Sequence, residues 1–150
     1  TLVNKFDQIA LIPSGDPWMK AEAPIASPKD RLAMCQVALE DFPDELQEKV
    51  FLLDIEIKRK GPTYTYDTLV SLRAFFPRDS FTLILGTDAA KSFDKWKRFE
   101  DIKKMADILV VKRPGSLPSE FKEIEIEALD IFVIFPISDT LAYIQLSLAN

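Results

Sequence analysis

The stretch FTLILGTDAA, residues 81–90, decides the class of fold. Its first five residues are apolar or β-branched, which is typical of a short strand that is buried on both faces. Gly86 then interrupts the strand, and Asp88 stands at the start of a helical pattern. A strand that passes through a glycine into a helix is the repeating unit of a parallel sheet covered by helices. We therefore predict an α/β protein.

The same alternation continues on both sides of this stretch. Ser27 followed by Pro28 and Asp30 predicts a capped helix start, and Asp54 and Glu56 are expected to alternate outward from a strand. The predicted strands cover residues 8–13, 50–57, 81–86, 108–111 and 124–129, and the predicted helices cover residues 28–41, 67–76, 89–96 and 99–105. We expect a single Rossmann-like domain over residues 1–150, incomplete at its N-terminus, with a parallel sheet flanked by helices.

Residues 131–150 differ from the rest of the chain. They contain no Lys or Arg and one acidic residue, Asp139. Two interpretations stay open: a buried strand with a terminal helix, or a gap in the sequence that precedes this atypical tail.

Composition narrows the class of partner. The chain has 47% apolar and 29% charged residues and a net charge of −5, with a pI of about 4.8. This balance argues against nucleic acid as a partner but not against a single nucleotide, which needs only a few well-placed donors. No run approaches the roughly 18 apolar residues of a membrane span. Cys35 is the only cysteine, so we expect a reducing cytoplasm and a buried, structural thiol.

Catalysis by this chain cannot use histidine, because the sequence has none. Nucleophilic triads and histidine metal sites are therefore excluded within these 150 residues.

The segment GPTYTYDTL, residues 61–69, is the strongest local motif. A glycine and a proline precede a helix start that Thr65 or Asp67 can cap, and free N–H groups there suit a carboxylate or a phosphate. Tyr64 and Tyr66 offer faces for stacking. The alternative is a simple turn before an amphipathic helix.

Four further segments offer similar choices. Gly86 lets a ligand approach the backbone, and Asp88 either caps a helix or accepts a ribose hydroxyl. Trp96, in an aromatic repeat of every third residue, either joins the core or stacks on a flat ring. Lys20 and Arg113 follow predicted strand ends, where a cation either meets a phosphate or is solvated.

The order of these motifs resembles bacterial nicotinate-nucleotide adenylyltransferases over roughly residues 1–130. The segments that carry the resemblance are PSGDPWMK (13–20), RLAM (31–34), GPTYTYDTL (61–69), LGTDA (85–89), residues 93–96 and VVKRPG (110–115). The resemblance implies transfer of AMP from ATP, with Mg²⁺, to nicotinate mononucleotide, which gives deamido-NAD and pyrophosphate in NAD biosynthesis.

The resemblance also implies roles for single residues. Tyr64, Thr65 and Trp96 would hold the nicotinate ring and its carboxylate. The nucleotide sugars would bind at Gly86 and Asp88, with Lys20 near the phosphates and Arg113 near ATP. The sequence leaves a homo-oligomer open.

Two family motifs are missing from residues 1–150. The N-terminal Gly-x-Phe-Asp-Pro-x-His-x-Gly-His motif is absent, so no catalytic residue is assigned. The Ser-Ser-Thr-x-Ile-Arg motif does not follow residues 128–131. Ser138 and Thr140 echo it as ATP ligands, but Tyr143 takes the arginine position. In the other alignment, residues 135–136 and 142–144 match the family's C-terminal helix.

Three hypotheses follow from these departures. The first is an adenylyltransferase that is longer than this chain, and the second is an inactive nucleotide-binding fragment. The third is a related enzyme with another substrate, such as a phosphopantetheine adenylyltransferase, against which Tyr64, Thr65 and Trp96 argue.

We expect negligible turnover from the 150-residue chain, because loss of even one charge-stabilising group typically lowers a rate by about 10²–10³. The measurement is an adenylyltransferase assay on a polypeptide whose intact mass is 17.1 kDa. Rates like those of full-length relatives would contradict this expectation.

Overall fold

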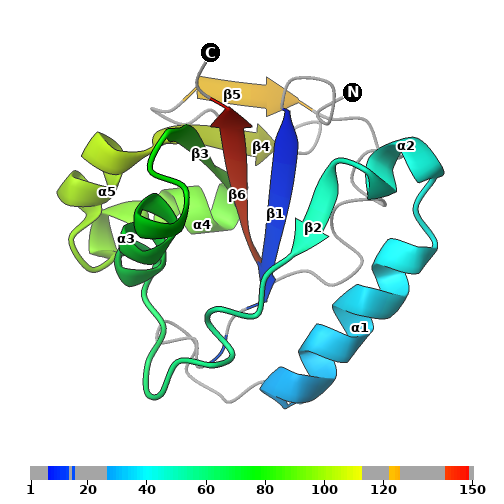
Figure 1. Cartoon of the computed structure of the whole chain (residues 1–150). Helices are drawn as coiled ribbons and strands as arrows, with labels where there is room; N and C mark the ends of the chain where they lie inside the picture. The colour runs from blue at the N-terminus through cyan, green and yellow to red at the C-terminus, as the bar shows by residue number, and fades with distance from the viewer. Residues whose placement is uncertain (1–6, 14, 16–26, 113–121, 126–140, 149–150) are drawn as a thin grey trace.

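A sheet of six strands forms the centre of the computed structural model, which describes residues 7–13, 15, 27–112, 122–125 and 141–148 (Figure 1). Across the sheet the order is β2-β1-β6-β3-β4-β5. The strands are β1 (Gln8–Pro13), β2 (Val50–Leu52), β3 (Asp79–Gly86), β4 (Asp107–Lys112), β5 (Lys122–Glu125) and β6 (Leu141–Leu148).

Five of these strands point the same way. β1 pairs with β2, and β4 pairs with both β3 and β5, always in parallel. β6 lies antiparallel between β1 and β3, so β1 and β3 are parallel to each other. The predicted parallel sheet is confirmed for these five strands, and β6 is an addition to it. The carboxyl ends of β1 to β5 therefore share one edge of the sheet, where open α/β folds bind ligands.

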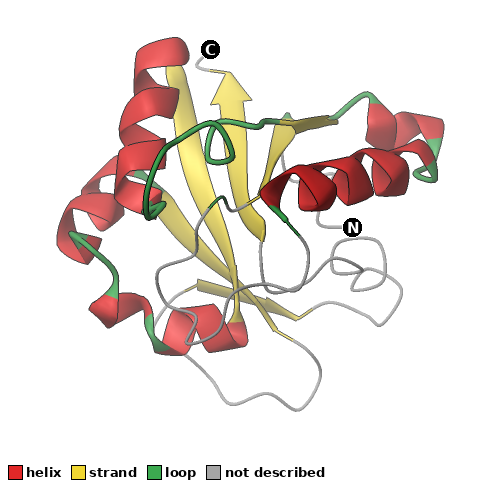
Figure 2. Ribbon diagram, turned by 90° about the horizontal axis from the view of Figure 1, so that it is seen from below, coloured by secondary structure: helices red, strands yellow, loops and turns green. Residues whose placement is uncertain are grey.

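Helices cover the sheet on two sides (Figures 1 and 2). In Figure 1, the helices α3, α4 and α5 lie to the left of the sheet, and α1 and α2 lie to the right. The helical segments are α1 (Pro28–Glu40), α2 (Asp44–Gln47), α3 (Thr65–Phe75), α4 (Thr87–Lys91), the 3₁₀ turn η2 (Phe93–Lys95) and α5 (Phe99–Met105). As predicted, Ser27 caps α1: its Oγ accepts a hydrogen bond from the Asp30 N–H at 3.1 Å.

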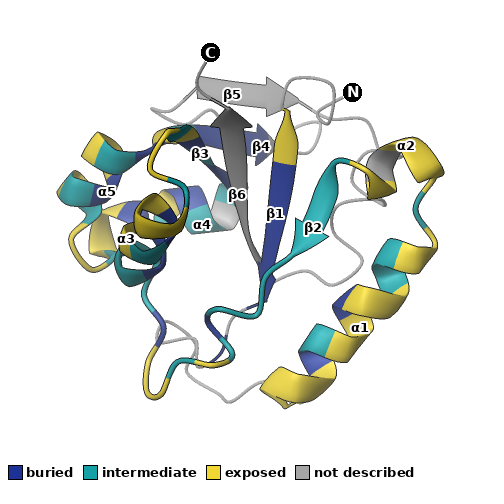
Figure 3. Cartoon of the chain, in the orientation of Figure 1, coloured by how far each residue is buried: buried dark blue, intermediate teal, exposed yellow. Residues whose placement is uncertain are grey.

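The apolar core fills the space between the sheet and the α3–α5 side (Figure 3). It joins side chains of β1 and β3 to side chains of α3, η2 and α5. Its fully buried members include Ile12, Leu69, Leu72, Leu83, Phe93 and Ile102. Cys35 is a free thiol that is 1% exposed, which confirms the predicted core role.

Several sequence predictions differ from the structure. β2 ends at Leu52, and Glu56 lies in a turn at 4% exposure. The prediction that Glu56 faces outward was therefore wrong, because the strand ends four residues earlier and its alternation of faces does not continue through the turn. The helix expected over residues 89–96 divides into α4 and η2.

The helix that the second alignment implied for residues 142–144 is also wrong, because they belong to β6. Two neighbouring strands offer unpaired backbone groups there, which favours a strand. Lys20, Arg113, Ser138 and Thr140 lie outside the described residues. Among the helices that are described, none is long and apolar enough to cross a bilayer.

The position of β6 gives a test of the sheet. Ile144 stands opposite Ala10 of β1 and Leu83 of β3. Ile144→Pro removes an N–H from a strand that is paired on both sides, so we expect a loss of at least about 1–3 kcal/mol in the free energy of unfolding. Ile144→Val is the matched control. Urea unfolding followed by circular dichroism measures both variants, and equal midpoints would mean that residues 141–148 do not pair at the centre.

Candidate functional site

The start of α3 lies at the carboxyl edge of the sheet, because α3 connects the end of β2 to the start of β3. The residue that precedes the helix is Tyr64, in an extended conformation, and its side chain does not cap the helix. Thr65 and Asp67 are the first and third helical residues, so the prediction that one of them is the N-cap was wrong. Without a side-chain cap from Tyr64, this helix start keeps backbone donors and a positive dipole end for an anion.

The segment after η2 packs directly on the start of α3. Lys97 Nζ lies 4.4 Å from the ring centroid of Tyr64 and 3.6 Å from Asp67 Oδ2. The Arg98 guanidinium lies 4.1 Å from the ring centroid of Tyr66. Two cation–π contacts and one ion pair thus join two motifs that are far apart in the sequence. The structure thus brings the start of α3, which holds Tyr64 and Thr65, together with Lys97 and Arg98, the two residues that follow Trp96.

The sequence left two alternatives for Trp96, which were to join the core or to stack on the flat ring of a ligand, and its surroundings have features of both. Its ring packs on Phe93, with centroids 5.2 Å apart and planes tilted by 59°, and it borders the core. It is nevertheless only half-buried. Its indole Nε1 is buried and has no hydrogen-bond partner within the described part of the chain, although buried indole N–H groups usually have one.

Arg98 holds the turn between Trp96 and α5. Its φ of 54° places it in the left-handed region, which a residue other than glycine adopts only at some energetic cost. Arg98 Nε donates to Asp101 Oδ2 at 2.8 Å, and this hydrogen bond is the main reason that the pKa of Arg98 is raised. The two contacts of its guanidinium, with Asp101 and with the Tyr66 ring, oppose the local strain.

Gly86 and Asp88 lie at a neighbouring strand end. Gly86 is both the last residue of β3 and the N-cap of α4, with φ −74° and ψ 169°. Asp88 is the second residue of α4 and not its N-cap. Gly86 pairs with Val111 of β4, so the ends of the two strands are level. The structure places Gly86 and Asp88 at a strand end, and their roles in binding the sugars stay predictions.

A buried polar network joins the segment before α3 to the first turn of that helix. Thr68 Oγ1 donates to Glu56 Oε1 at 2.8 Å, and Arg59 Nη1 donates to Thr68 Oγ1 at 3.0 Å. Burial raises the pKa of Glu56, against the lowering effects of the Thr68 hydrogen bond, the Arg59 charge and a hydrogen bond from Thr63. Sequence analysis missed this role, because strand alternation placed Glu56 on the outside.

Arg31 ties the end of β1 to α1. Its Nη2 donates to the Gly15 carbonyl oxygen at 2.8 Å, and the side chain is 4% exposed. Burial lowers the pKa of Arg31, while the nearby Cys35 thiol opposes this shift. The Nε and Nη1 groups are buried without partners among the residues that the structure describes. One sequence feature pointed to Arg31: it lies four residues before Cys35, on the buried stripe of α1.

Gly15 also contacts the polar network. A Cβ atom built on Gly15 would overlap the backbone carbonyl of Glu56 and touch the Thr63 methyl group. Only glycine allows this close approach. Gly15 is therefore packed between Arg31 of α1 and the turn that carries Glu56.

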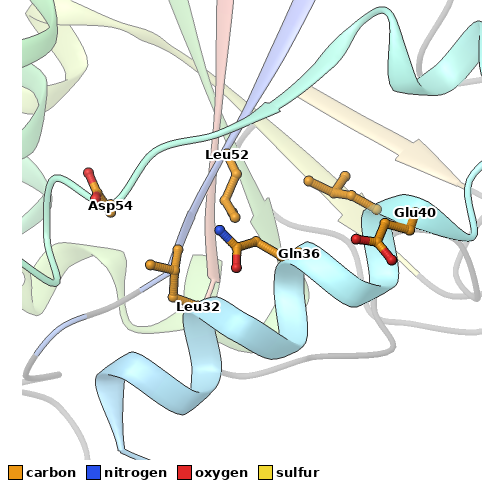
Figure 4. A pocket seen from close by; sticks show the side chains of 6 residues that line it. Leu32, Gln36, Glu40, Leu52 and Asp54 are labelled. Atoms are coloured by element: carbon orange, nitrogen blue, oxygen red, sulfur yellow. The ribbon is translucent and has the colours of Figure 1, made fainter.

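A separate groove of about 480 Å³ lies between α1 and the end of β2 (Figure 4). Apolar and polar side chains of both elements line it: Leu32, Gln36, Leu39, Glu40, Leu52 and Asp54. None of the predicted site residues belongs to this lining. Within the described ranges, no group of three His, Cys, Asp or Glu side chains is arranged to hold a metal ion.

Comparison with known proteins identifies the family of this chain. Residues 1–143 match the family model described as Cytidylyltransferase-like. A protein of Dehalococcoides mccartyi, named "Probable nicotinate-nucleotide adenylyltransferase", is 32% identical over 121 residues, which are 80% of this chain and 57% of that protein. A protein of the same name from Hahella chejuensis is 40% identical over 109 residues, 72% of this chain and 47% of the relative.

The chain therefore spans about half the length of the curated relatives it matches. Among solved structures, a Plasmodium falciparum nicotinic acid mononucleotide adenylyltransferase complexed with NaAD aligns with a TM-score of 0.69 and 18% identity. The alignment covers 88% of this chain and 66% of that one. At this identity the likeness supports the fold alone.

The buried Glu56 makes the stability of the protein depend on pH. Burial raises the pKa of Glu56 above its ordinary value of 4.5. Between that value and the raised one, the folded protein keeps a proton that the unfolded chain has lost, so stability falls as pH rises through this window.

We therefore expect the unfolding free energy of the wild type, minus that of Glu56→Gln, to decrease as pH rises from about 4, the ordinary range of a glutamate. Urea unfolding at a series of pH values measures it. Glu48→Gln, at an exposed position, is the control. A difference that stays constant or grows with pH would show that the pKa of Glu56 is not raised.

Proposed function

We propose that this chain, which belongs to the cytidylyltransferase-like family, forms the nucleotide-binding part of a nicotinate-nucleotide adenylyltransferase. The reaction transfers AMP from ATP to nicotinate mononucleotide and releases deamido-NAD and pyrophosphate, a step in NAD biosynthesis. One observation carries the proposal: Lys97, the residue after Trp96, contacts Tyr64 and Asp67 at the start of α3. The names of the relatives support the same choice of substrate.

The nicotinate moiety fits the start of α3. A carboxylate there would accept hydrogen bonds from the first backbone N–H groups of the helix, at Thr65 and beyond, and would meet the positive end of the helix dipole. The ring of Trp96 offers an apolar face for the pyridine ring. Tyr64 contributes a second aromatic surface, whose position is fixed by Lys97.

The nucleotide sugars and phosphates would lie along the same edge. We assign the sugars to Gly86 and Asp88, at the end of β3. Lys20 is proposed for the phosphates, and Arg113, Ser138 and Thr140 for ATP, on the sequence resemblance alone.

In this reaction the main contribution of the protein is to position the two substrates. An oxygen of the mononucleotide phosphate attacks the α-phosphorus of ATP in line, a new P–O bond forms, and the bond to the bridging oxygen of pyrophosphate breaks. Such transfers depend on alignment and on neutralisation of charge more than on covalent help from side chains. A rigid edge that holds the acceptor suits this task.

Mg²⁺ is proposed to enter with ATP. Magnesium is commonly held by one or two carboxylates together with substrate phosphates. The triphosphate itself would supply ligands to the metal. Bound in this way, Mg²⁺ would neutralise charge on the leaving pyrophosphate.

The cellular setting is also a proposal. Cys35 is buried and free, which is compatible with a cytoplasmic location. A homo-oligomer stays a prediction.

Binding experiments test the acceptor site separately from turnover. Isothermal titration should detect nicotinate mononucleotide binding to the wild-type chain. We expect Trp96→Ala to weaken binding by about two- to tenfold, the loss of an aromatic contact worth about 0.5–1.5 kcal/mol. Trp96→Phe should retain most of the affinity. Phe75→Ala is the control, because Phe75 is an aromatic residue that is 69% exposed.

The results also separate the hypotheses. Preference for phosphopantetheine would support the related enzyme, and binding of nicotinate mononucleotide without turnover would support the fragment. An absence of nicotinate mononucleotide binding would sink the proposed acceptor site.

A further inference from the structure

Glu56 is a buried acid for which the proposed reaction has no direct use. It lies in the turn between β2 and α3, with 4% of the residue exposed. Removing a carboxylate from water is costly unless hydrogen bonds and charge compensate for it. An apolar residue of similar size would often stabilise such a position as well or better. The local stability of the fold therefore does not explain why an acid is buried here.

The hydrogen bonds of Glu56 run in one direction. Arg59 Nη1 donates to Thr68 Oγ1, and the single hydroxyl proton of Thr68 then points to Glu56 Oε1. Thr68 Oγ1 lies 3.3 Å from the Tyr64 carbonyl oxygen, a longer and competing contact. Because the carboxylate accepts the hydrogen bond of this hydroxyl at 2.8 Å, it fixes the orientation of Thr68 in the first turn of α3.

The partners of Glu56 flank the proposed acceptor site. Thr63, which also donates to the Glu56 side chain, comes just before Tyr64. Thr68 closes the first helical turn through its N–H bond to the Tyr64 carbonyl at 3.2 Å. Glu56 thus contacts the chain on both sides of Tyr64 and Thr65 without belonging to that pair.

The backbone of Glu56 has a second role in the same place. Its carbonyl fills the space in which Gly15 would carry a side chain. Gly15 in turn accepts the hydrogen bond of the buried Arg31. One residue therefore links the loop after β1 to the segment that begins α3.

We propose that Glu56, acting through Thr63 and Thr68, is a positioning residue that fixes the Tyr64–Thr65 segment for the acceptor nucleotide. This inference rests on the proposed function for the identity of the nucleotide. The position of the segment itself can be measured without any ligand.

The experiment compares four variants of the full chain. Thr68→Val removes the hydroxyl but keeps the shape, and Thr68→Ser restores the hydroxyl. Glu56→Gln keeps the shape of the side chain but removes its charge. Ser71→Ala is the matched control, because Ser71 Oγ donates to the Asp67 carbonyl on the same helix, away from Glu56.

Two measurements are made on each variant. The first is hydrogen exchange at the amides of residues 68–70, which close the first turn of α3 on the carbonyls of residues 64–66, compared with those of β4. The second is the dissociation constant of nicotinate mononucleotide. We expect Thr68→Val and Glu56→Gln to speed exchange at residues 68–70 selectively and to weaken binding about tenfold, whereas Thr68→Ser and Ser71→Ala stay near the wild type. Selective exchange with rescue by serine separates positioning from a general loss of stability.

The outcomes test two claims: that Glu56 positions the Tyr64–Thr65 segment, and that this position serves the acceptor nucleotide. Unchanged exchange at residues 68–70 in Thr68→Val and Glu56→Gln would overturn the positioning role. Faster exchange with unchanged binding would overturn its link to the acceptor. If the wild type does not bind nicotinate mononucleotide, the proposed function fails, while the exchange data still decide the role of Glu56. If Thr68→Val does not fold, Glu56→Gln decides the same question.

Discussion

The pairing of β6 with both β1 and β3 is the constraint on which the rest of the structure depends. Without β6 the sheet would consist of two parts, β2-β1 and β3-β4-β5. The proposed acceptor segment follows β2, whereas the proposed sugar site ends β3. These two segments can face one ligand only if the sheet holds its halves in register. A strand with neighbours on both sides satisfies its backbone groups through both ladders, so it fixes that register firmly.

Local charge then brings the loops of this edge together. The chain carries a net charge of −5, yet Lys97 and Arg98 both lie over tyrosine rings at the start of α3. Exposed cation–π contacts are worth only about 0.5–1 kcal/mol each. Two such contacts and the ion pair with Asp67 act on one short segment, and together they hold Lys97 and Arg98 against the start of α3. Orientation of this kind matters more to a transfer reaction than the small gain in stability.

The sequence predicted the regular part of the fold and missed the irregular part. Apolar runs such as residues 81–86 and the Ser27 cap depend on local patterns, which a single sequence contains. Glu56 was misplaced because its burial depends on Thr68, twelve residues away, and on a bend that strand alternation does not reveal. The position of β6 depends on partners at the other end of the chain. For the site, the motifs at Tyr64, Thr65 and Trp96 were found by their order, but the network that supports them depends on long-range contacts.

The distribution of buried polar residues separates stability from function. Among the described residues, the buried polar or charged ones are Arg31, Glu56, Thr63 and Thr68. All four surround Gly15 and the start of α3, and the core behind them is apolar. A fold under selection for stability alone would not concentrate its most costly groups at one edge. Buried charges of opposite sign on either side of Gly15 instead give this edge a rigid shape that apolar packing, which lacks directional bonds, would specify less closely. At the carboxyl edge, therefore, buried polar groups lower the stability of the fold and in return give the backbone a defined position.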